Sequence, residues 1–435
     1  MYDLGIINGH VYKNQKYQNI NIYIKDGIIQ ELSKDILEAN EIYDAKALNI
    51  YPGIIDPHTH FELDLGHIKS KDNFKEGTKA AVFGGVTTII DFLAPVNNKD
   101  DLIKEMHMRS NQAKNSLIDY KFHACLKNPK GNVLELVKTL PKLGLNTVKI
   151  FTTYSDSNRR TYSLEIKELL ELTKTHNFLV TAHIENDDMI NLNRDFTYKD
   201  LSISRPTISE TSEALLLAEL VRETKGFLYM VHCSSGVTLQ KLKAEYSDIL
   251  NSHFFIESCP HYFSFSNDVF SHAKGYLYTM APPLRSASEV ALLKNYIDDV
   301  YTIGTDHCTF DQAQKSKRKL SETPLGVGGI EYSFDVMYSY FGDKIVDKMT
   351  LNVAKAHKLF PQKGIIEVGS DADLFLYQLK DRLLTENHSA TDHFIYQNFP
   401  VKGQVVSTIS KGQFVLKNRQ LIIQQGQLLN KVVTL

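Results

Sequence analysis

The stretch Ile54-Ile55-Asp56-Pro57-His58-Thr59-His60 joins a short apolar run to two histidines one residue apart. The run is typical of a buried β-strand, and side chains at positions i and i+2 of a strand point the same way. His58 and His60 are therefore placed to bind one metal ion together. In a chain with 16 histidines such a pair also arises from surface or hydrogen-bonded core residues. Further candidate ligands elsewhere in the sequence are needed to distinguish a metal site from such residues.

Short β-rich runs alternate with amphipathic stretches from about residue 50 to residue 345. This alternation predicts βα units and a parallel sheet. Eight strands can be recognised, which is the number that closes a TIM barrel. We predict an α/β fold with a (β/α)8 barrel over residues 51–365. The expected strands are centred on residues 54–56, 87–92, 120–124, 147–151, 178–182, 227–231, 253–256 and 300–304.

Two of the intervening helices have recognisable start signals. Ser163 is a candidate N-cap for a helix whose apolar face runs from Ile166 to Thr173. Ser209 is a candidate N-cap for a second helix, which continues through residues 215–220. Both helices fit the outer ring of a barrel.

The two chain ends have a different pattern. Residues 1–50 contain short alternating strands such as Ile20–Ile24, followed by the turn Asp26-Gly27. Residues 373–377 repeat this style near the other end. We predict one small β-sandwich domain built from residues 1–50 together with residues 366–435.

Candidate metal ligands fall where the predicted strands end. The carboxyl ends of the strands are where a TIM barrel builds its active site. Each residue alone also has a structural interpretation: His183 as a hydrogen-bonded partner of Glu185, His232 as a strand cap, Asp306 as an ion-pair partner of His307. Their shared position favours a metal centre. The candidates are His58 and His60 on strand 1, Lys149 on strand 4, His183 on strand 5, His232 on strand 6 and Asp306 on strand 8.

Lys149 needs a separate explanation, because a protonated ammonium cannot coordinate a cation and is costly to bury near one. A desolvated lysine with a lowered pKa can react with carbon dioxide to form a carbamate. The carbamate offers two oxygens and a negative charge that can bridge two metal ions. We therefore expect N6-carboxylysine at position 149.

Composition limits the classes of partner. The formal net charge of -2 gives no electrostatic case for nucleic acid or an anionic membrane. No apolar run has the length of a membrane helix, and the start of the chain lacks the pattern of a secretion signal, so we expect a cytoplasmic location. The cysteines Cys125, Cys233, Cys259 and Cys308 lack CxxC spacing and are expected to be free thiols.

The chain resembles the amidohydrolase superfamily and, within it, the cyclic amidases that include dihydropyrimidinase, hydantoinase, allantoinase and dihydroorotase. The resemblance spans nearly the whole chain. The segment from Gly304 to Phe310, with Gln314-Lys315 after it, is most similar to dihydropyrimidinases and hydantoinases. The other motifs that carry it lie at residues 52–60, 84–92, 148–151, 182–186, 231–232, 257–262, 282–285 and 369–374.

The resemblance implies two divalent metal ions. It assigns His58, His60 and Asp306 to one ion and His183 and His232 to the other, with carboxylated Lys149 and a hydroxide bridging both. Zinc is the expected metal, with manganese as the alternative.

The resemblance also implies roles in catalysis. The expected reaction is metal-dependent hydrolysis of a cyclic amide to an N-carbamoyl amino acid, with Asp306 carrying the proton to the leaving nitrogen. Tyr154 would donate a hydrogen bond to the developing oxyanion, although it is also a candidate for simple packing at the barrel rim.

Several positions bear on the substrate. Glu62 occupies the place where dihydroorotases have an arginine for the substrate carboxylate, so dihydroorotate is disfavoured. Ala281 and Leu325 replace a usual serine and asparagine at positions that contact the ring amide. Phe61, Leu63 and Leu65 are candidates for lining the pocket of the ring substituent, or for packing under a helix.

The sequence leaves three rival functions open. The chain could be an allantoinase or dihydroorotase, a mononuclear deaminase of the same superfamily, or a non-catalytic scaffold related to dihydropyrimidinase. The filled ligand positions favour an enzyme, and Lys149 argues against the deaminase. By resemblance, we expect a homo-oligomer, either a tetramer or a dimer.

Overall fold

The computed structural model describes residues 1–429 and contains the predicted barrel. All eight of its strands are parallel neighbours in the order β15-β14-β13-β12-β11-β10-β9-β8. A bridge between Thr59 and His307 draws the two edge strands together. The strands are β8 (Ile54–Thr59), β9 (Val86–Phe92), β10 (Asp119–Cys125), β11 (Thr147–Phe151), β12 (Leu179–His183), β13 (Leu228–Met230), β14 (Phe254–Ser258) and β15 (Thr302–Ile303).

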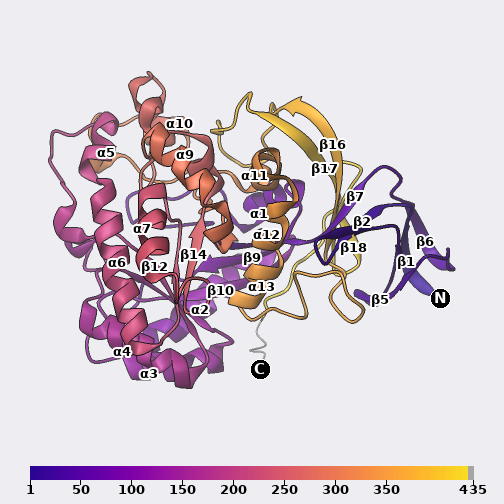
Figure 1. Cartoon of the computed structure of the whole chain (residues 1–435), viewed down its shortest axis with the longest axis horizontal. Coiled ribbons are helices and arrows are strands. Elements are labelled where there is room, and N and C mark those ends of the chain that lie inside the picture. Colours follow the sequence, from indigo (N-terminus) through magenta and orange to yellow (C-terminus); the bar gives the residue numbers. More distant parts are fainter. Residues whose placement is uncertain (430–435) are drawn as a thin grey trace.

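Helices cover the outside of the barrel (Figure 1). Every residue of β8, β9 and β10 is buried, as expected for parallel strands covered on both faces. The helices are α1 (Phe74–Phe83), α2 (Lys99–Gln112), α3 (Val133–Thr139), α4 (Ser163–His176), α5 (Leu201–Ser204), α6 (Thr207–Thr224), α7 (Gly236–Tyr246), α8 (Pro260–Ser264), α9 (Ala287–Asn295), α10 (Gln312–Lys315), α11 (Ser333–Phe341), α12 (Val346–Met349) and α13 (Leu351–Ala356).

Neither predicted serine holds the N-cap position of its helix. Helix α4 buries the expected face, but Ser163 is its first residue and Tyr162 holds the cap position. Helix α6 begins at Thr207 because Pro206, which cannot donate a backbone hydrogen bond, sets its start. Ser209 therefore lies inside the helix, and its hydroxyl donates to the carbonyl of Asn186 at 2.9 Å.

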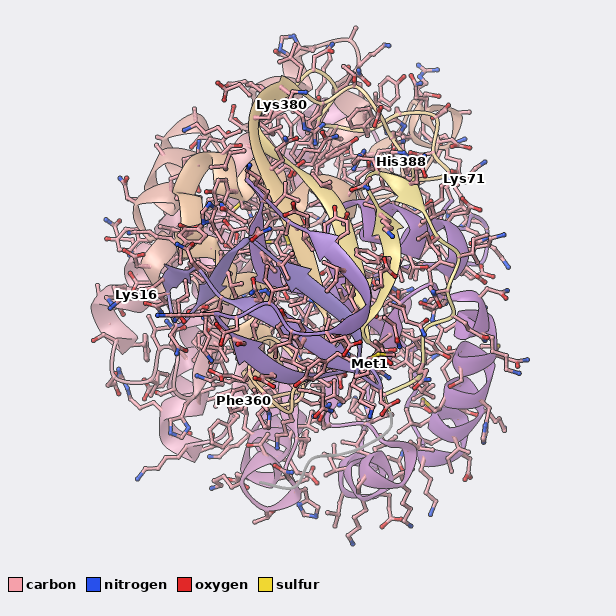
Figure 2. The ribbon with its side chains drawn as sticks, turned by 90° about the vertical axis from the view of Figure 1, so that its right-hand side faces the viewer. Met1, Lys16, Lys71, Phe360, Lys380 and His388 are labelled. Atoms are coloured by element: carbon pink, nitrogen blue, oxygen red, sulfur yellow. The ribbon has the colours of Figure 1, made fainter. Side chains whose placement is uncertain are left out.

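Both chain ends contribute to an extra β domain beside the barrel. Its two sheets have the strand orders β5-β4-β1-β6 and β19-β18-β17-β16-β7-β2-β3. Figure 2 shows the indigo N-terminal strands beside the yellow C-terminal ones. The strands are β1 (Tyr2–Ile7), β2 (His10–Lys13), β3 (Lys16–Gln18), β4 (Asn21–Lys25), β5 (Ile28–Ser33), β6 (Ala39–Asp44), β7 (Asn49–Pro52), β16 (Leu374–Leu383), β17 (Pro400–Ser410), β18 (Gln413–Lys417) and β19 (Gln420–Leu421).

A separate core holds the two sheets together. Ile6 and Ile22 from one sheet pack with Leu374 and Ile409 from the other. The chain then returns to the barrel, where the N–H of Tyr120 on β10 donates to the carbonyl of Gln427 at 3.0 Å. The division at residues 50 and 366 stays a prediction.

Among the described residues, no helix combines the length and the apolar composition that crossing a membrane requires.

Candidate metal centre

One cavity of about 380 Å³ opens at the carboxyl ends of the barrel strands. This volume lies in the range of small-molecule sites, roughly 300–1,000 Å³. All the predicted metal ligands and ring-contacting residues line it: His58, His60, Lys149, Tyr154, His183, His232, Ala281, Asp306 and Leu325.

His58, His60 and Asp306 form the most compact group in the cavity. Oδ1 of Asp306 lies 3.2 Å from Nε2 of His58 and 3.1 Å from Nε2 of His60. One potential ligand atom from each residue lies within 4.8 Å of the other two. Burial tends to raise the pKa of Asp306, but the two histidines outweigh burial and hold the pKa well below its usual value. The carboxylate is therefore ionised and able to bind a cation.

His183 and His232 bring a second pair of imidazoles to the same cavity. Their ring centroids are 4.6 Å apart, and the His232 ring is 5.4 Å from that of His58. Burial lowers the pKa of both histidines below the ordinary value, and they are neutral, as a metal ligand must be. Nδ1 of His232 is buried and has no hydrogen-bond partner within residues 1–429.

Lys149 is buried beside the four histidines. Its Nζ lies 5.0 Å from the ring centroid of Phe92 and 5.5 Å from that of Phe151. In the described part of the chain no carboxylate forms an ion pair with it. Burial lowers the pKa of its amine to about 8.

Glu257 contacts two of the candidate ligands, His58 and His232. It was not predicted as a site residue. Its Oε1 lies 2.7 Å from Nδ1 of His58 and accepts a hydrogen bond from the backbone N–H of His232 at 3.0 Å. Tyr229 donates to the other carboxylate oxygen at 2.8 Å. Burial lowers the pKa of His58, but Glu257 and Asp306 more than compensate and raise it to about 9. Glu257 thus orients His58 and ties it to the backbone of His232.

Glu185 and Arg205 support His183. Oε2 of Glu185 lies 2.6 Å from Nε2 of His183, which leaves Nδ1 of that ring for other contacts. The hydrogen-bonded pair considered from the sequence is therefore present, and it does not remove His183 from the cavity. Arg205 forms a buried ion pair with the same carboxylate. Burial raises the pKa of Glu185, but Arg205 and His183 reverse this and lower it to about 2.

One other interpretation from the sequence is wrong. His307 does not pair with Asp306; its Nε2 lies 2.7 Å from Oδ2 of Asp72. Of the two places considered for Phe61, the structure shows the one under a helix, because Phe61 is fully buried and packs edge-on against Phe74 of α1. Leu63 and Leu65 do line the cavity.

Comparison with known protein families matches residues 49–415 to the amidohydrolase family. The chain belongs to this family. This amidohydrolase is 30% identical to the D-hydantoinase of Geobacillus stearothermophilus over 97% of this chain and 94% of the relative. It is also 30% identical to the D-phenylhydantoinase of Escherichia coli O81 (strain ED1a), over 94% of each chain.

Solved structures agree in fold. A crystal structure of D-hydantoinase superposes with a TM-score of 0.92 at 28% identity and covers 98% of this amidohydrolase and 97% of that chain. The dihydropyrimidinase from Brevibacillus agri NCHU1002 superposes with a TM-score of 0.91 at 27% identity, covering 97% and 96%. These matches confirm the predicted barrel with its extra β domain.

The amidohydrolase family and its hydantoinase relatives imply a binuclear metal centre. The residues present fit such a group. The cavity is lined by the four candidate imidazoles, by the ionised carboxylate of Asp306 and by the buried amine of Lys149, which lacks an acidic partner within residues 1–429. Nδ1 of His232 is unpaired there. Imidazole and carboxylate donors suit divalent zinc and its neighbours in the first transition series.

Glu257→Gln is expected to weaken metal binding by about 10- to 100-fold, because it removes the charged acceptor that orients His58. Competition with a chromophoric chelator measures this affinity. Glu331→Gln is the matched control, since Glu331 makes a similar 2.6 Å contact with Nδ1 of His388, a residue that does not line the cavity. Equal affinities in the Glu257 variant and the wild type would contradict the supporting role.

Proposed function

We propose that this amidohydrolase opens a cyclic amide of the dihydropyrimidine or hydantoin type to an N-carbamoyl amino acid. The observation that carries the proposal is the convergence of four histidines, Lys149 and Asp306 on one cavity beside Tyr154. Relatives named D-hydantoinase and D-phenylhydantoinase, similar over nearly the whole chain, support the substrate class.

The proposed metal ligands divide into two sets. His58, His60 and Asp306 would hold one divalent ion, His183 and His232 the other, and Lys149, as N6-carboxylysine, would join them. Zinc is our first choice and manganese the second. Two such ions supply a nucleophilic water at neutral pH and polarise the carbonyl group that it attacks.

Asp306 is the proposed proton carrier. Its carboxylate faces the open cavity and is held by His58 and His60 at 3.1–3.2 Å. It would accept the proton of the attacking water and deliver it to the departing ring nitrogen. An amide nitrogen leaves poorly as an anion, so this delivery lowers the barrier to ring opening.

Tyr154 is the proposed donor to the developing oxyanion. Burial raises the pKa of its hydroxyl, which therefore stays protonated at neutral pH, and its ring lies 5.2 Å from that of His183. Tyr154→Phe is expected to lower kcat by about 10²- to 10³-fold with bound metal unchanged. Steady-state kinetics and metal analysis of the variant check this. A kcat within about twofold of wild type would leave Tyr154 with a packing role only.

The substrate ring is proposed to lie against Ala281 and Leu325, which line the cavity near Tyr154. Glu62 also lines the cavity, and an acidic group there repels a carboxylate attached directly to the ring. This charge favours a neutral ring over dihydroorotate.

The substrate proposal is tested by turnover of dihydrouracil, hydantoin, allantoin and dihydroorotate by the metal-loaded protein. Fastest opening of dihydrouracil or hydantoin supports it, and dihydroorotate or allantoin as the best substrate would reassign the chain. Metal content distinguishes a binuclear hydrolase from a deaminase or a scaffold. About two ions per chain fit the proposal, one ion favours a mononuclear deaminase, and no bound ion favours a scaffold.

A cytoplasmic location and self-association as a tetramer or dimer complete the proposal. Self-association follows from the resemblance to cyclic amidases and agrees with the lack of charge for nucleic acid or membrane partners. Light scattering coupled to size-exclusion chromatography measures the oligomeric state directly.

A further inference from the structure

Arg159 is a charged residue of the cavity that the proposed reaction does not use. It is half-buried and lines the same cavity as the metal-ligand candidates. Within residues 1–429 its guanidinium forms no ion pair and no hydrogen bond. Such a guanidinium keeps its charge and its fork of N–H donors available to bind an anion.

Several other ionised groups of the cavity already have partners. Arg109 forms a 2.5 Å ion pair with Asp91. Asp64 lies 2.9 Å from the ammonium of Lys69. Glu105 accepts a backbone hydrogen bond from the loop between β9 and α2 at 3.0 Å. Of the two arginines that line the cavity, Arg109 and Arg159, only Arg159 therefore lacks an acidic partner among residues 1–429.

The loop that carries Arg159 is fixed at both ends. The N–H of Arg159 donates to the carbonyl of Tyr154 at 3.0 Å, and the Thr153 hydroxyl donates to Asp187 at 3.0 Å. On the other side, the neighbouring Arg160 pairs with Asp187 at 3.5 Å and with Asp188 at 3.1 Å. Two adjacent arginines therefore differ: one is neutralised by the protein and anchors the loop, while the other is held at the cavity without a counterion among residues 1–429.

The charge of Arg159 acts on two other side chains that line the cavity, Tyr154 and Cys125. Burial raises the pKa of the Tyr154 hydroxyl and of the Cys125 thiol, and the Arg159 guanidinium opposes both shifts. Both of these side chains line the cavity. Arg159 and Tyr154 also lie on one short loop, joined by the 3.0 Å backbone hydrogen bond, and both line the cavity, so a substrate whose carbonyl lies beside Tyr154 would have its substituent within reach of Arg159.

We propose that Arg159 binds an anionic group on the ring substituent, so that the preferred substrates are cyclic ureides with a carboxylate-bearing side chain. The guanidinium can pair with a carboxylate through two parallel hydrogen bonds. This inference rests on the proposed function, because it assigns the substituent of that same substrate.

The location of Glu62 sets the direction of the substituent. Glu62 follows β8, whereas Arg159 follows β11, three strands away in the barrel sheet. The Glu62 carboxylate accepts a weak hydrogen bond of 3.4 Å from the N–H of Phe74 at the start of α1. The acidic Glu62 and the basic Arg159 therefore reach the cavity from strands three places apart. A carboxylate on a side chain that extends toward Arg159 is favoured, whereas one attached to the ring near Glu62 is not.

The test compares two hydantoins of nearly equal shape, one with a 2-carboxyethyl and one with a 2-carbamoylethyl substituent at ring carbon 5. For Arg159→Gln, kcat/KM for the carboxylate substrate is expected to fall by about 10- to 100-fold, and that for the neutral amide by less than about threefold. For Arg159→Lys, the fall in kcat/KM for the carboxylate substrate should be smaller than for Arg159→Gln, because lysine keeps the charge but loses the paired hydrogen bonds. Arg160→Gln removes the same charge from the next residue and should leave the ratio of the two kcat/KM values unchanged.

Calorimetric binding of the same two compounds separates this inference from the proposed function. Binding of the carboxylate compound that depends on Arg159, without opening of any ring, would support the ligand assignment and overturn the proposed reaction. Opening of both rings with a ratio that Arg159→Gln does not change would overturn the ligand assignment alone. Equal losses for both compounds in Arg159→Gln would also overturn it, because they would indicate a structural role.

Discussion

Replacing Lys149 with alanine is expected to reduce bound metal from about two ions per chain to fewer than one and to abolish ring opening. The Lys149 side chain is 2% exposed and lines the cavity with the four histidines. A bare ammonium there would repel cations, whereas a carbamate adds a negative charge and two oxygen ligands. Alanine removes both. Elemental analysis of the purified protein and turnover of hydantoin measure the two effects.

Two controls make this result specific. Lys121→Met replaces another fully buried lysine, on β10, which does not line the cavity and whose pKa burial also lowers to about 8. It should keep its metal and its activity. Short carboxylic acids such as acetate should partly restore the Lys149→Ala enzyme, because they offer two oxygens where the carbamate was. Full metal content and wild-type turnover in Lys149→Ala would disprove the bridging role.

The barrel was predictable from the sequence because its strands are buried on both faces. Such strands appear as nearly continuous apolar runs, and β9 and β11 lie within one residue of their expected positions. The candidate ligands were found by the same means, since the histidines and Asp306 end or follow one of these runs and Lys149 lies within one. Their convergence in one cavity is a consequence of the parallel barrel, whose strand ends all meet at one rim.

The two places considered for Phe61 could not be separated from the sequence, because the backbone leaves the β region just after β8. The register between β8 and β9 shifts between Asp56 and Thr59, and Glu62 has a φ of 49°. Strand alternation therefore does not identify which of the following side chains face the cavity. Phe61 enters the core, while Glu62 and Leu63 both line the cavity.

The supporting residues were harder to predict because they act across long separations in sequence. Glu257 lies 199 residues from His58, its imidazole partner. Arg205 lies 20 residues from Glu185, in the segment between α5 and α6 that has no periodic pattern. Glu257 did fall within a motif that carries the family resemblance, and its position at the end of a predicted strand was the available signal.

Asp306→Asn is expected to lower kcat by about 10²- to 10⁴-fold while the fold is kept. Asparagine has nearly the same shape but cannot accept and deliver a proton, and it weakens the contact with His58 and His60. Steady-state kinetics with hydantoin measure the loss, and thermal unfolding monitored by circular dichroism checks the fold. Asp311→Asn is the control, because Asp311 pairs with Lys71 at 2.6 Å and does not line the cavity.

A loss of rate in Asp306→Asn could arise from lost metal or from lost proton transfer, and two measurements separate these causes. Metal content of the variant reports the first directly. The second is tested with a cyclic amide whose leaving nitrogen carries an electron-withdrawing group, since such a nitrogen departs with less need of a proton. If Asp306 delivers that proton, the activated substrate should recover most of the lost rate in the metal-loaded variant. Near-normal turnover of hydantoin itself, or an equal loss for both substrates at full metal content, would exclude Asp306 as the proton carrier.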